Sequence, residues 1–296
     1  MFSFLTNPDW ETDGAAWPHR ASSRFVDAGD YRWHVQRMGK GPTLALIHGT
    51  GAATHSWAGL APLLAQSFDV VAFDLPGHGF TQSKRWSPPS LRHVAKEVGL
   101  LLDALDAAPD LVVGHSAGAA IMIRMATDKL IAPSTAVSIN GALSPFGGAA
   151  AVIFPAMAKL LYYNPFAALA FAQGARSEKR VERLVEQTGS TVPDEYVQCY
   201  RALMRRPGHV AGALGMMAHW DLAEMDQRLA ALTFPCMFVA GAGDKAVPPG
   251  ESERVAALAP RGRSAVLPDL GHLAHEEAPA VIAQIIAEVA SSADIR

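Results

Sequence analysis

The chain has 296 residues, of which 50% are hydrophobic and 18% are charged, and its formal net charge is −3. This length allows one large domain, or one domain with an insertion. The slightly acidic balance argues against a nucleic-acid partner. Two cysteines, Cys199 and Cys236, are too few for a disulfide framework. With no secretory signal in the first residues and no apolar run of membrane-spanning length, a cytoplasmic protein is expected.

A series of short strands is expected along the chain. Residues 24–39 read as a hairpin whose turn lies at 28–30. The apolar runs that follow end in glycine or proline, which is typical of strands buried on both faces of a parallel sheet. These runs cover residues 44–51, 69–79, 111–118, 135–141, 236–244 and 264–272.

Helical patterns lie between these strands. Residues 90–106 carry their apolar side chains on one helix face, and residues 117–130 and 279–290 show the same pattern. The alternation of strand and helix predicts an α/β fold, with a mostly parallel sheet and helices on both faces.

One region interrupts the alternation. Between Asn140 and Phe234 there is no strand pattern, and residues 142–175 carry a single charge, Lys159. We predict that residues 142–232 form a helical lid inserted after the sixth strand, and that residues 1–141 and 233–296 form the core. The alternative is an ordinary set of core helices that pack on the sheet.

The run LVVGHSAG, residues 111–118, suggests a nucleophile. A strand that enters G-x-S-x-G and then a helix is the pattern of a nucleophile elbow, in which a strained turn projects the serine above the sheet. Gly114 and Gly118 leave room for the neighbouring chain, and the helix N-terminus stabilises negative charge. These features predict Ser116 as the nucleophile.

A reactive serine needs a base, and the base needs an orienting acid. Asp244 and His272 both follow predicted strands, at the edge where open α/β sheets place their sites. We predict His272 as the base and Asp244 as its partner. His275 remains an alternative base, and Asp269 an alternative acid with a competing role in a turn.

An oxyanion hole is expected where HGTG, residues 48–51, ends the first core strand. The backbone N–H groups of Thr50 and Ala117 are the predicted donors, with Gly51 as the alternative to Thr50. DLPGHG, residues 74–79, is interpreted as a structural turn in which Gly77 and Gly79 take unusual backbone angles.

The motifs HGTG, DLPGHG, GHSAG, GAGDKAVP and GHLAHEE, in this order, resemble those of the α/β-hydrolase superfamily over residues 24–290. The resemblance implies the same catalytic triad and a lid after the sixth strand. Dehalogenases and epoxide hydrolases of this fold carry Asp at the elbow, so the serine argues against those activities. No cofactor fingerprint and no metal-ligand spacing is found, and neither a cofactor nor a metal is predicted.

A narrower resemblance connects the chain with the magnesium chelatase accessory proteins of bacteriochlorophyll biosynthesis. It is carried by PDWETDGAAWPHRASSRFV, HGTGAATHSWAGLAPLL, SINGALSPFGG and PGHVAGALGMMAHWDL. It implies an apolar small-molecule substrate, with a protoporphyrin as the candidate, and an association with the chelatase or with the surface of the inner membrane.

Two functions follow from these resemblances. One is a serine hydrolase acting on an apolar ester or a tetrapyrrole intermediate, and the other is a porphyrin-binding accessory protein without catalysis. The lid is predicted to roof an apolar cavity above Ser116. The residues expected to contact substrate are His115, Phe154, Tyr162 and Trp220.

Overall fold

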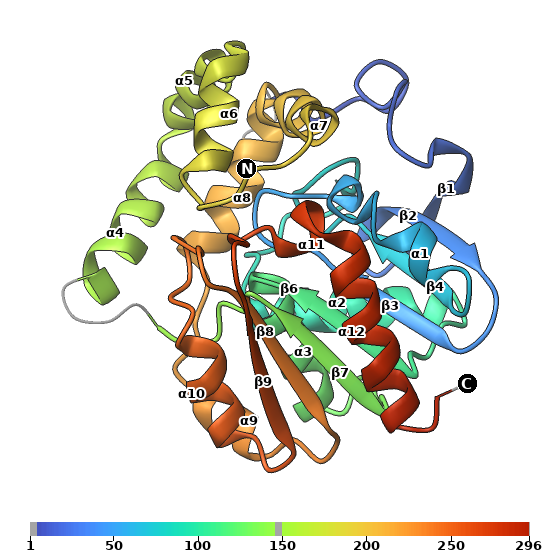
Figure 1. The fold of residues 1–296 in the computed structure, drawn as a ribbon. Helices are drawn as coiled ribbons and strands as arrows, with labels where there is room; N and C mark the ends of the chain where they lie inside the picture. The colour runs from blue at the N-terminus through green and yellow to red at the C-terminus, as the bar shows by residue number, and fades with distance from the viewer. Residues whose placement is uncertain (1–4, 146–149, 296) are drawn as a thin grey trace.

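The computed structural model describes residues 5–145 and 150–295, with the side chains of 150–156 and 165 also left out. A nine-stranded sheet forms the centre (Figure 1), in the order β1-β2-β4-β3-β6-β7-β8-β9, and β5 pairs with β2. The strands are β1 (Ser23–Ala28), β2 (Tyr31–Gly39), β3 (Thr43–Ile47), β4 (Asp69–Phe73), β5 (Gln82–Ser83), β6 (Leu111–His115), β7 (Thr135–Ile139), β8 (Cys236–Gly241) and β9 (Gly262–Leu267).

The predicted α/β fold with a mostly parallel sheet is confirmed. Strand β2 pairs antiparallel with β1, β4 and β5, and all other pairs, from β4 to β9, are parallel. The hairpin turn lies at Gly29 and Asp30, as the sequence indicates. The only unexpected strand of the described chain is β5, which has two exposed residues and therefore no apolar pattern.

Helices cover both faces of the sheet. On one face α2 (Leu91–Ala104), α3 (Ala117–Thr127) and α10 (Glu251–Leu258) share an apolar cluster, and on the other α1 (Ala61–Leu64) and α12 (Pro279–Ser292) do so. Two short 3-10 helices, η1 (Arg20–Ser22) and η2 (Thr54–Trp57), and α11 (Ala274–Glu277) lie in connections. Helix α10 was not predicted, whereas α2, α3 and α12 match the three predicted helices within a few residues.

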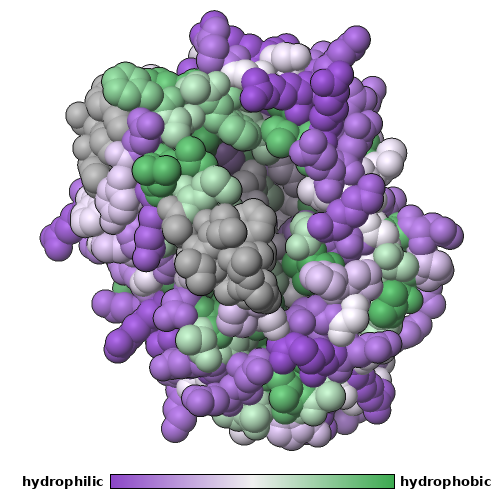
Figure 2. Space-filling view, turned by 90° about the vertical axis from the view of Figure 1, so that its left-hand side faces the viewer, coloured by the Kyte–Doolittle hydropathy of each residue, from purple (hydrophilic) through white to green (hydrophobic). Residues whose placement is uncertain are grey.

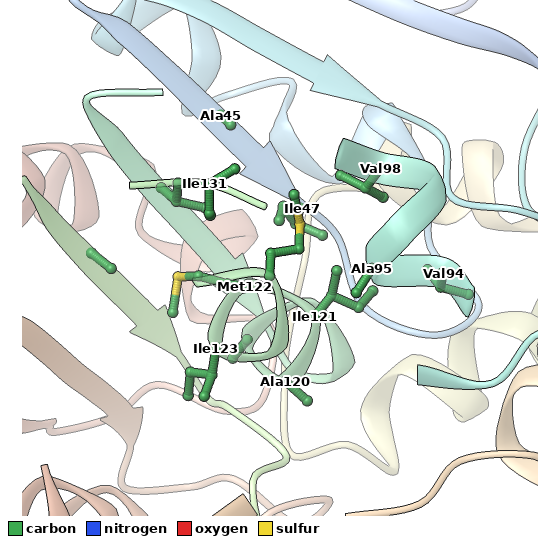
Figure 3. Packing of buried hydrophobic residues seen from close by; sticks show 14 of the residues in the cluster. Ala45, Ile47, Val94, Ala95, Val98, Ala120, Ile121, Met122, Ile123 and Ile131 are labelled. Atoms are coloured by element: carbon green, nitrogen blue, oxygen red, sulfur yellow. The ribbon is translucent and has the colours of Figure 1, made fainter. Parts of the chain in front are cut away.

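The packing of α3 explains how the elbow is held. Ile121 and Met122 on α3 are fully buried in the same cluster as Ile47 at the end of β3 and Val98 on α2 (Figure 3). Burying side chains of this size stabilises a fold by roughly 1.5–3 kcal/mol each. The helix that follows Ser116 is therefore anchored to the sheet along its length.

Between β7 and β8 every described element is a helix. They are α4 (Ala150–Tyr163), α5 (Pro165–Gly174), α6 (Glu178–Glu186), α7 (Asp194–Met204), α8 (Pro207–Ala218) and α9 (Met225–Ala230). Helices α4 and α5 pack on α8 at the outer edge of the molecule (Figure 1). Helix α9 lies inside the predicted lid range 142–232 but packs on α3 and α10, with Met225 and Leu229 in the main core. The division into core and lid remains a prediction.

Candidate active site

The turn after β6 has the strained geometry expected of an elbow. Ser116 has φ 51° and ψ −117°, a conformation that costs free energy for any residue with a side chain. Its backbone N–H donates to Ile139 O at 3.0 Å, which ties the turn to β7. A Cβ atom on Gly118 would lie 2.1 Å from Ile47 O, and one on Gly114 would lie 2.6 Å from Ala119 N. The two glycines of G-x-S-x-G are therefore required by close backbone contacts.

The predicted base and acid lie together. His272 Nδ1 is 2.8 Å from Asp244 Oδ2, and Asp244 Oδ1 accepts the N–H groups of Ala246 and Val247 at 2.7 and 2.8 Å. Burial raises the pKa of the Asp244 carboxyl, but the bonds from His272 and Val247 outweigh it and hold the pKa below its usual value. The ionised carboxylate accepts the proton on Nδ1, so the neutral ring of His272 keeps Nε2 free to accept a proton.

A third residue, which was not among the predicted site residues, completes this group. Asn140 Nδ2 donates to Asp244 Oδ2 at 2.7 Å and to Gly271 O at 3.2 Å. Asn140 directly follows β7, has φ 47° and is buried. One amide thus links the acid to the loop that carries His272. In the sequence, the only sign of this role is that Asn140 is a polar residue directly after an apolar strand.

The alternative base and acid have other partners. His275 is completely buried, its Nε2 is 2.8 Å from Ser56 Oγ, and burial lowers its pKa to about 3. Asp269 is exposed with φ 59°, which suits the turn role. These positions favour His272 and Asp244 for catalysis.

The HGTG loop lies against the elbow. A Cβ on Gly49 would lie 2.9 Å from Ser116 Cβ. The backbone N–H groups of Thr50, Gly51 and Ala117 donate to no backbone carbonyl in the described chain, so the two predicted donors and the alternative all remain free for an oxyanion. Gly51 has φ 83° and open space around it.

His209 on α8 connects two turns of the site, the DLPGHG turn and the HGTG loop. Its Nδ1 accepts the Gly79 N–H at 3.1 Å, and its Nε2 lies 3.1 Å from Gly51 O, so it donates from Nε2. Burial lowers its pKa to about 4, and the ring is therefore neutral. With both nitrogens engaged, His209 positions the HGTG loop and is not available as a metal ligand. Gly77 and Gly79 have φ 77° and 50°, as predicted for DLPGHG.

The predicted substrate contacts fall in different places. His115 is buried, and its Nε2 donates to His272 O at 3.0 Å. Its ring also packs on the rings of His272 and His275, so His115 supports the base and does not line an open site. Tyr162 is buried against Gly215 and His219. Trp220 is half-buried against the core. The side chain of Phe154 lies outside the described residues.

One cleft of the described chain lies away from the elbow. It has a volume of about 280 Å³ and lies between the start of α2 and the segment after α8, next to His219. The predicted apolar cavity above Ser116 therefore stays a prediction.

A segment of the predicted lid holds both triad loops. Residues 188–191, between α6 and α7, contribute the Thr188 carbonyl oxygen, which accepts the Lys245 N–H at 3.0 Å. The Ser190 hydroxyl accepts the Leu273 N–H at 2.8 Å. Gly189 passes so close that a Cβ there would lie 2.0 Å from Gly243 O. This contact could not be predicted, because it joins residues far apart in the chain.

Among the described residues, one group brings three metal-ligand types together: Asp30, His93 and Glu97. Glu97 Oε2 already accepts the Asp30 N–H at 2.8 Å, and His93 Nε2 lies 3.2 Å from the Tyr31 hydroxyl. The group joins α2 to the β1–β2 turn. These hydrogen bonds explain why the three residues lie together without the need for a metal ion.

Comparisons with known proteins agree with this geometry. The family described as the alpha/beta hydrolase fold matches residues 42–279. The chain belongs to the α/β-hydrolase family. The magnesium-chelatase 30 kDa subunit of Rhodobacter capsulatus is 37% identical over 266 residues, which cover 89% of this chain and 93% of that protein. The chain is a relative of that subunit over nearly its whole length, so the narrower resemblance is confirmed.

Two other relatives show how varied the chemistry on this fold is. An esterase from Thermogutta terrifontis superposes with a TM-score of 0.73 at 20% identity, covering 92% of this chain and 98% of the esterase. A fluoroacetate dehalogenase from Burkholderia sp. is 37% identical over 109 residues, or 36% of each chain. The hydrolase fold alone therefore does not decide which bond is cleaved, because the reaction depends on the residues of the site.

Proposed function

We propose that this chain is a serine hydrolase that cleaves an ester or similar acyl bond of an apolar substrate. The observation that carries the proposal is the Asp244–His272 pair, bonded at 2.8 Å, on the same sheet edge as the strained Ser116. The side chain of His272 keeps 10% of its surface exposed. A binding protein has no physical need for all three groups in this order.

The reaction follows from the positions of these groups. Ser116 Oγ attacks the acyl carbon while His272 Nε2 takes the hydroxyl proton, and Asp244 stabilises the imidazolium. The N–H groups of Ala117 and of Thr50 or Gly51 stabilise the oxyanion, each worth roughly 2.7–4 kcal/mol of barrier. His272 then gives its proton to the leaving oxygen. Water, activated by the same histidine, releases the acid and restores the serine.

The biological setting is proposed from the chelatase relative. We place the chain in the cytoplasm, at the face of the inner membrane, in bacteriochlorophyll biosynthesis near the magnesium chelation step. A tetrapyrrole intermediate is the proposed substrate, and a chelatase subunit is the proposed partner. Support comes from the 37% identity to a protein named as a magnesium-chelatase subunit.

A fluorophosphonate probe tests the catalytic proposal. It should label Ser116 covalently in the full chain and should leave Ser116→Ala unlabelled. His272→Ala should lower labelling by several orders of magnitude, because the base is lost. His275→Ala is the matched variant and should retain more reactivity than His272→Ala. Failure of the folded wild-type protein to react would contradict the hydrolase proposal.

A second function is favoured by the relative's name alone: an accessory protein that binds a porphyrin on a hydrolase fold. Titration with protoporphyrin and its magnesium complex, followed by the Soret band, separates the two. Saturable pigment binding by a protein that the probe does not label would support the accessory function. Ester turnover without pigment binding would remove the tetrapyrrole from the proposal.

A further inference from the structure

Helices α4 and α5 expose several large apolar side chains, here called the docking face. Phe166 is 74% exposed and Leu160 is 71% exposed. The other members are at least a third exposed: Met157, Leu161, Tyr163, Leu169 and Phe171. Figure 2 shows apolar side chains gathered on this side of the molecule, next to a hollow.

The clustering is what separates this face from ordinary surface. Fourteen large apolar side chains of the described chain are exposed, and seven of them fall within residues 157–171. Single exposed apolar residues are normal, but a contiguous patch marks an interaction site. Met217 of α8, on which both helices pack, is exposed as well.

Exposed basic side chains lie on and next to the docking face. The sequence contains no Asp or Glu from residue 129 to 177. Lys159 is exposed on α4, and Arg176, Lys179 and Arg180 are exposed just after α5. The first nearby acid, Glu178, is paired with Arg201 at 3.3 Å. Apolar side chains with cations beside them suit a surface of anionic lipid headgroups over acyl chains.

We propose that the docking face binds the surface of an anionic lipid bilayer. The helices have 14 and 10 residues, whereas a span needs about 20, so they lie in the interface and do not cross it. No helix of the described residues is long and apolar enough to span a membrane.

Self-association fits this surface less well than a bilayer does. A symmetric contact between two copies would gather the cations of both copies, Lys159, Arg176, Lys179 and Arg180, at one interface, because each partner uses the same patch. Like charges would then oppose burial of the apolar side chains. The face also forms an outer edge of the molecule (Figure 1), which is accessible to a flat surface.

The docking face is also joined to the candidate active site. Both helices pack on α8. Helix α8 carries His209, bonded to Gly51 O, and Met216, whose sulfur accepts the Thr50 hydroxyl at 3.1 Å. A bilayer that binds α4 and α5 therefore contacts the element that holds the HGTG loop. Membrane binding itself does not depend on the proposed hydrolase reaction.

Vesicle co-sedimentation of the full-length protein tests this proposal. We expect binding to vesicles of phosphatidylglycerol and phosphatidylcholine, and weaker binding to phosphatidylcholine alone. Leu160→Ser and Phe166→Ser should each weaken the partition coefficient by about tenfold. Both side chains are exposed, so the thermal unfolding midpoint should not fall. Val281→Ser on α12, where Val281 is 45% exposed, is the matched control and should bind as the wild type does.

Three results would overturn the proposal. The wild-type protein could remain in solution with anionic vesicles, or the two docking-face variants could bind as tightly as the control. Alternatively, light scattering could show a dimer that Phe166→Ser dissociates while no vesicle binding is seen, which would assign the face to self-association. Fluorophosphonate labelling of Ser116 is independent of all three, so failure of docking and failure of catalysis can be told apart.

Discussion

The Ser190 hydroxyl accepts a hydrogen bond from the Leu273 backbone N–H at 2.8 Å, although 83 positions separate the two residues. Ser190 belongs to the predicted lid and Leu273 directly follows His272. Because Thr188 bonds to Lys245, next to Asp244, the same segment contacts the loops of both the acid and the base. The predicted lid is thus joined to the loops of Asp244 and His272 through residues 188–191.

Removing the Ser190 hydroxyl should affect turnover more than substrate binding. In Ser190→Ala the buried Leu273 N–H loses its acceptor, which costs about 1–3 kcal/mol of stability. The looser loop should move His272 away from Ser116, so kcat toward a short-chain ester should fall about tenfold with little change in KM. Kinetics at several ester concentrations would measure both parameters.

Thr135→Val is the control for Ser190→Ala. It removes a buried hydroxyl that bonds to Pro235 O at 2.9 Å, at the opposite end of the sheet from the site. This variant should lose stability while its kcat remains unchanged. Equal losses of kcat in both variants would show that Ser190 acts only through stability.

Asn140 should matter for the acid of the triad. Asn140→Gly removes the amide while keeping a residue that tolerates φ 47°, so it should fold. Asp244 then loses one donor to its charged form, and its pKa should rise. The acidic limb of the pH–rate profile should therefore move to higher pH, with kcat at neutral pH lowered several-fold.

Asn140→Ala separates backbone strain from the lost amide. It should show the same shift in the pH profile, together with an additional stability loss of about 1 kcal/mol, because Ala disfavours the left-handed conformation. An unchanged profile in both variants would mean that Asn140 does not support Asp244. If Asn140→Gly lost stability and Asn140→Ala did not, the left-handed backbone conformation would not explain the loss.

Much of this molecule could be read from the sequence because the signals are local. Each parallel strand is a continuous apolar run, and each site residue predicted for the triad follows one of those runs. Asn140 also follows such a run, but it is not a carboxylate and was not predicted as a site residue. The pairing of β7 with β8 brings it to Asp244. The contacts of His209 and Ser190 depend on how the helices between β7 and β8 pack on the rest of the chain, which local patterns do not determine.

Gly118 is the second glycine of the G-x-S-x-G motif, and the reason it must be glycine is its contact with the distant strand β3. Its Cβ position lies 2.1 Å from Ile47 O and 2.8 Å from His48 O, so a methyl group would push β3 from α3. Gly118→Ala should lower the free energy of unfolding by about 3 kcal/mol or more. Gly250→Ala, with nothing within 4 Å, should leave it nearly unchanged. Urea unfolding of both variants checks this, and a stable Gly118→Ala protein would contradict the close packing.

Glu276, four residues after His272, should make stability depend on pH. It is fully buried, and Tyr200 on α7 donates to its Oε1 at 2.7 Å, while the Ser56 hydroxyl is also bonded to it. Burial raises the pKa of its carboxyl to about 8, although both bonds act to lower it. His275 Nε2 lies 3.9 Å away and, with its pKa lowered by burial to about 3, carries no compensating charge.

The sign of the pH effect follows from where the proton is held. The unfolded chain releases this proton near the ordinary value of 4.5, whereas the folded protein keeps it up to about 8. Stability from this group is therefore complete below pH 4.5 and is lost as the pH rises toward 8, by an amount on the order of a few kcal/mol. The Glu276→Gln side chain stays neutral, so this variant should lose less stability than the wild type when the pH rises by ~3 units, from about 5.5 to about 8.5. Urea unfolding at the two pH values measures the loss. Glu253→Gln, at an exposed position on α10, should keep the wild-type dependence. If Glu276→Gln loses as much stability with rising pH as the wild type does, Glu276 is already ionised in the folded protein.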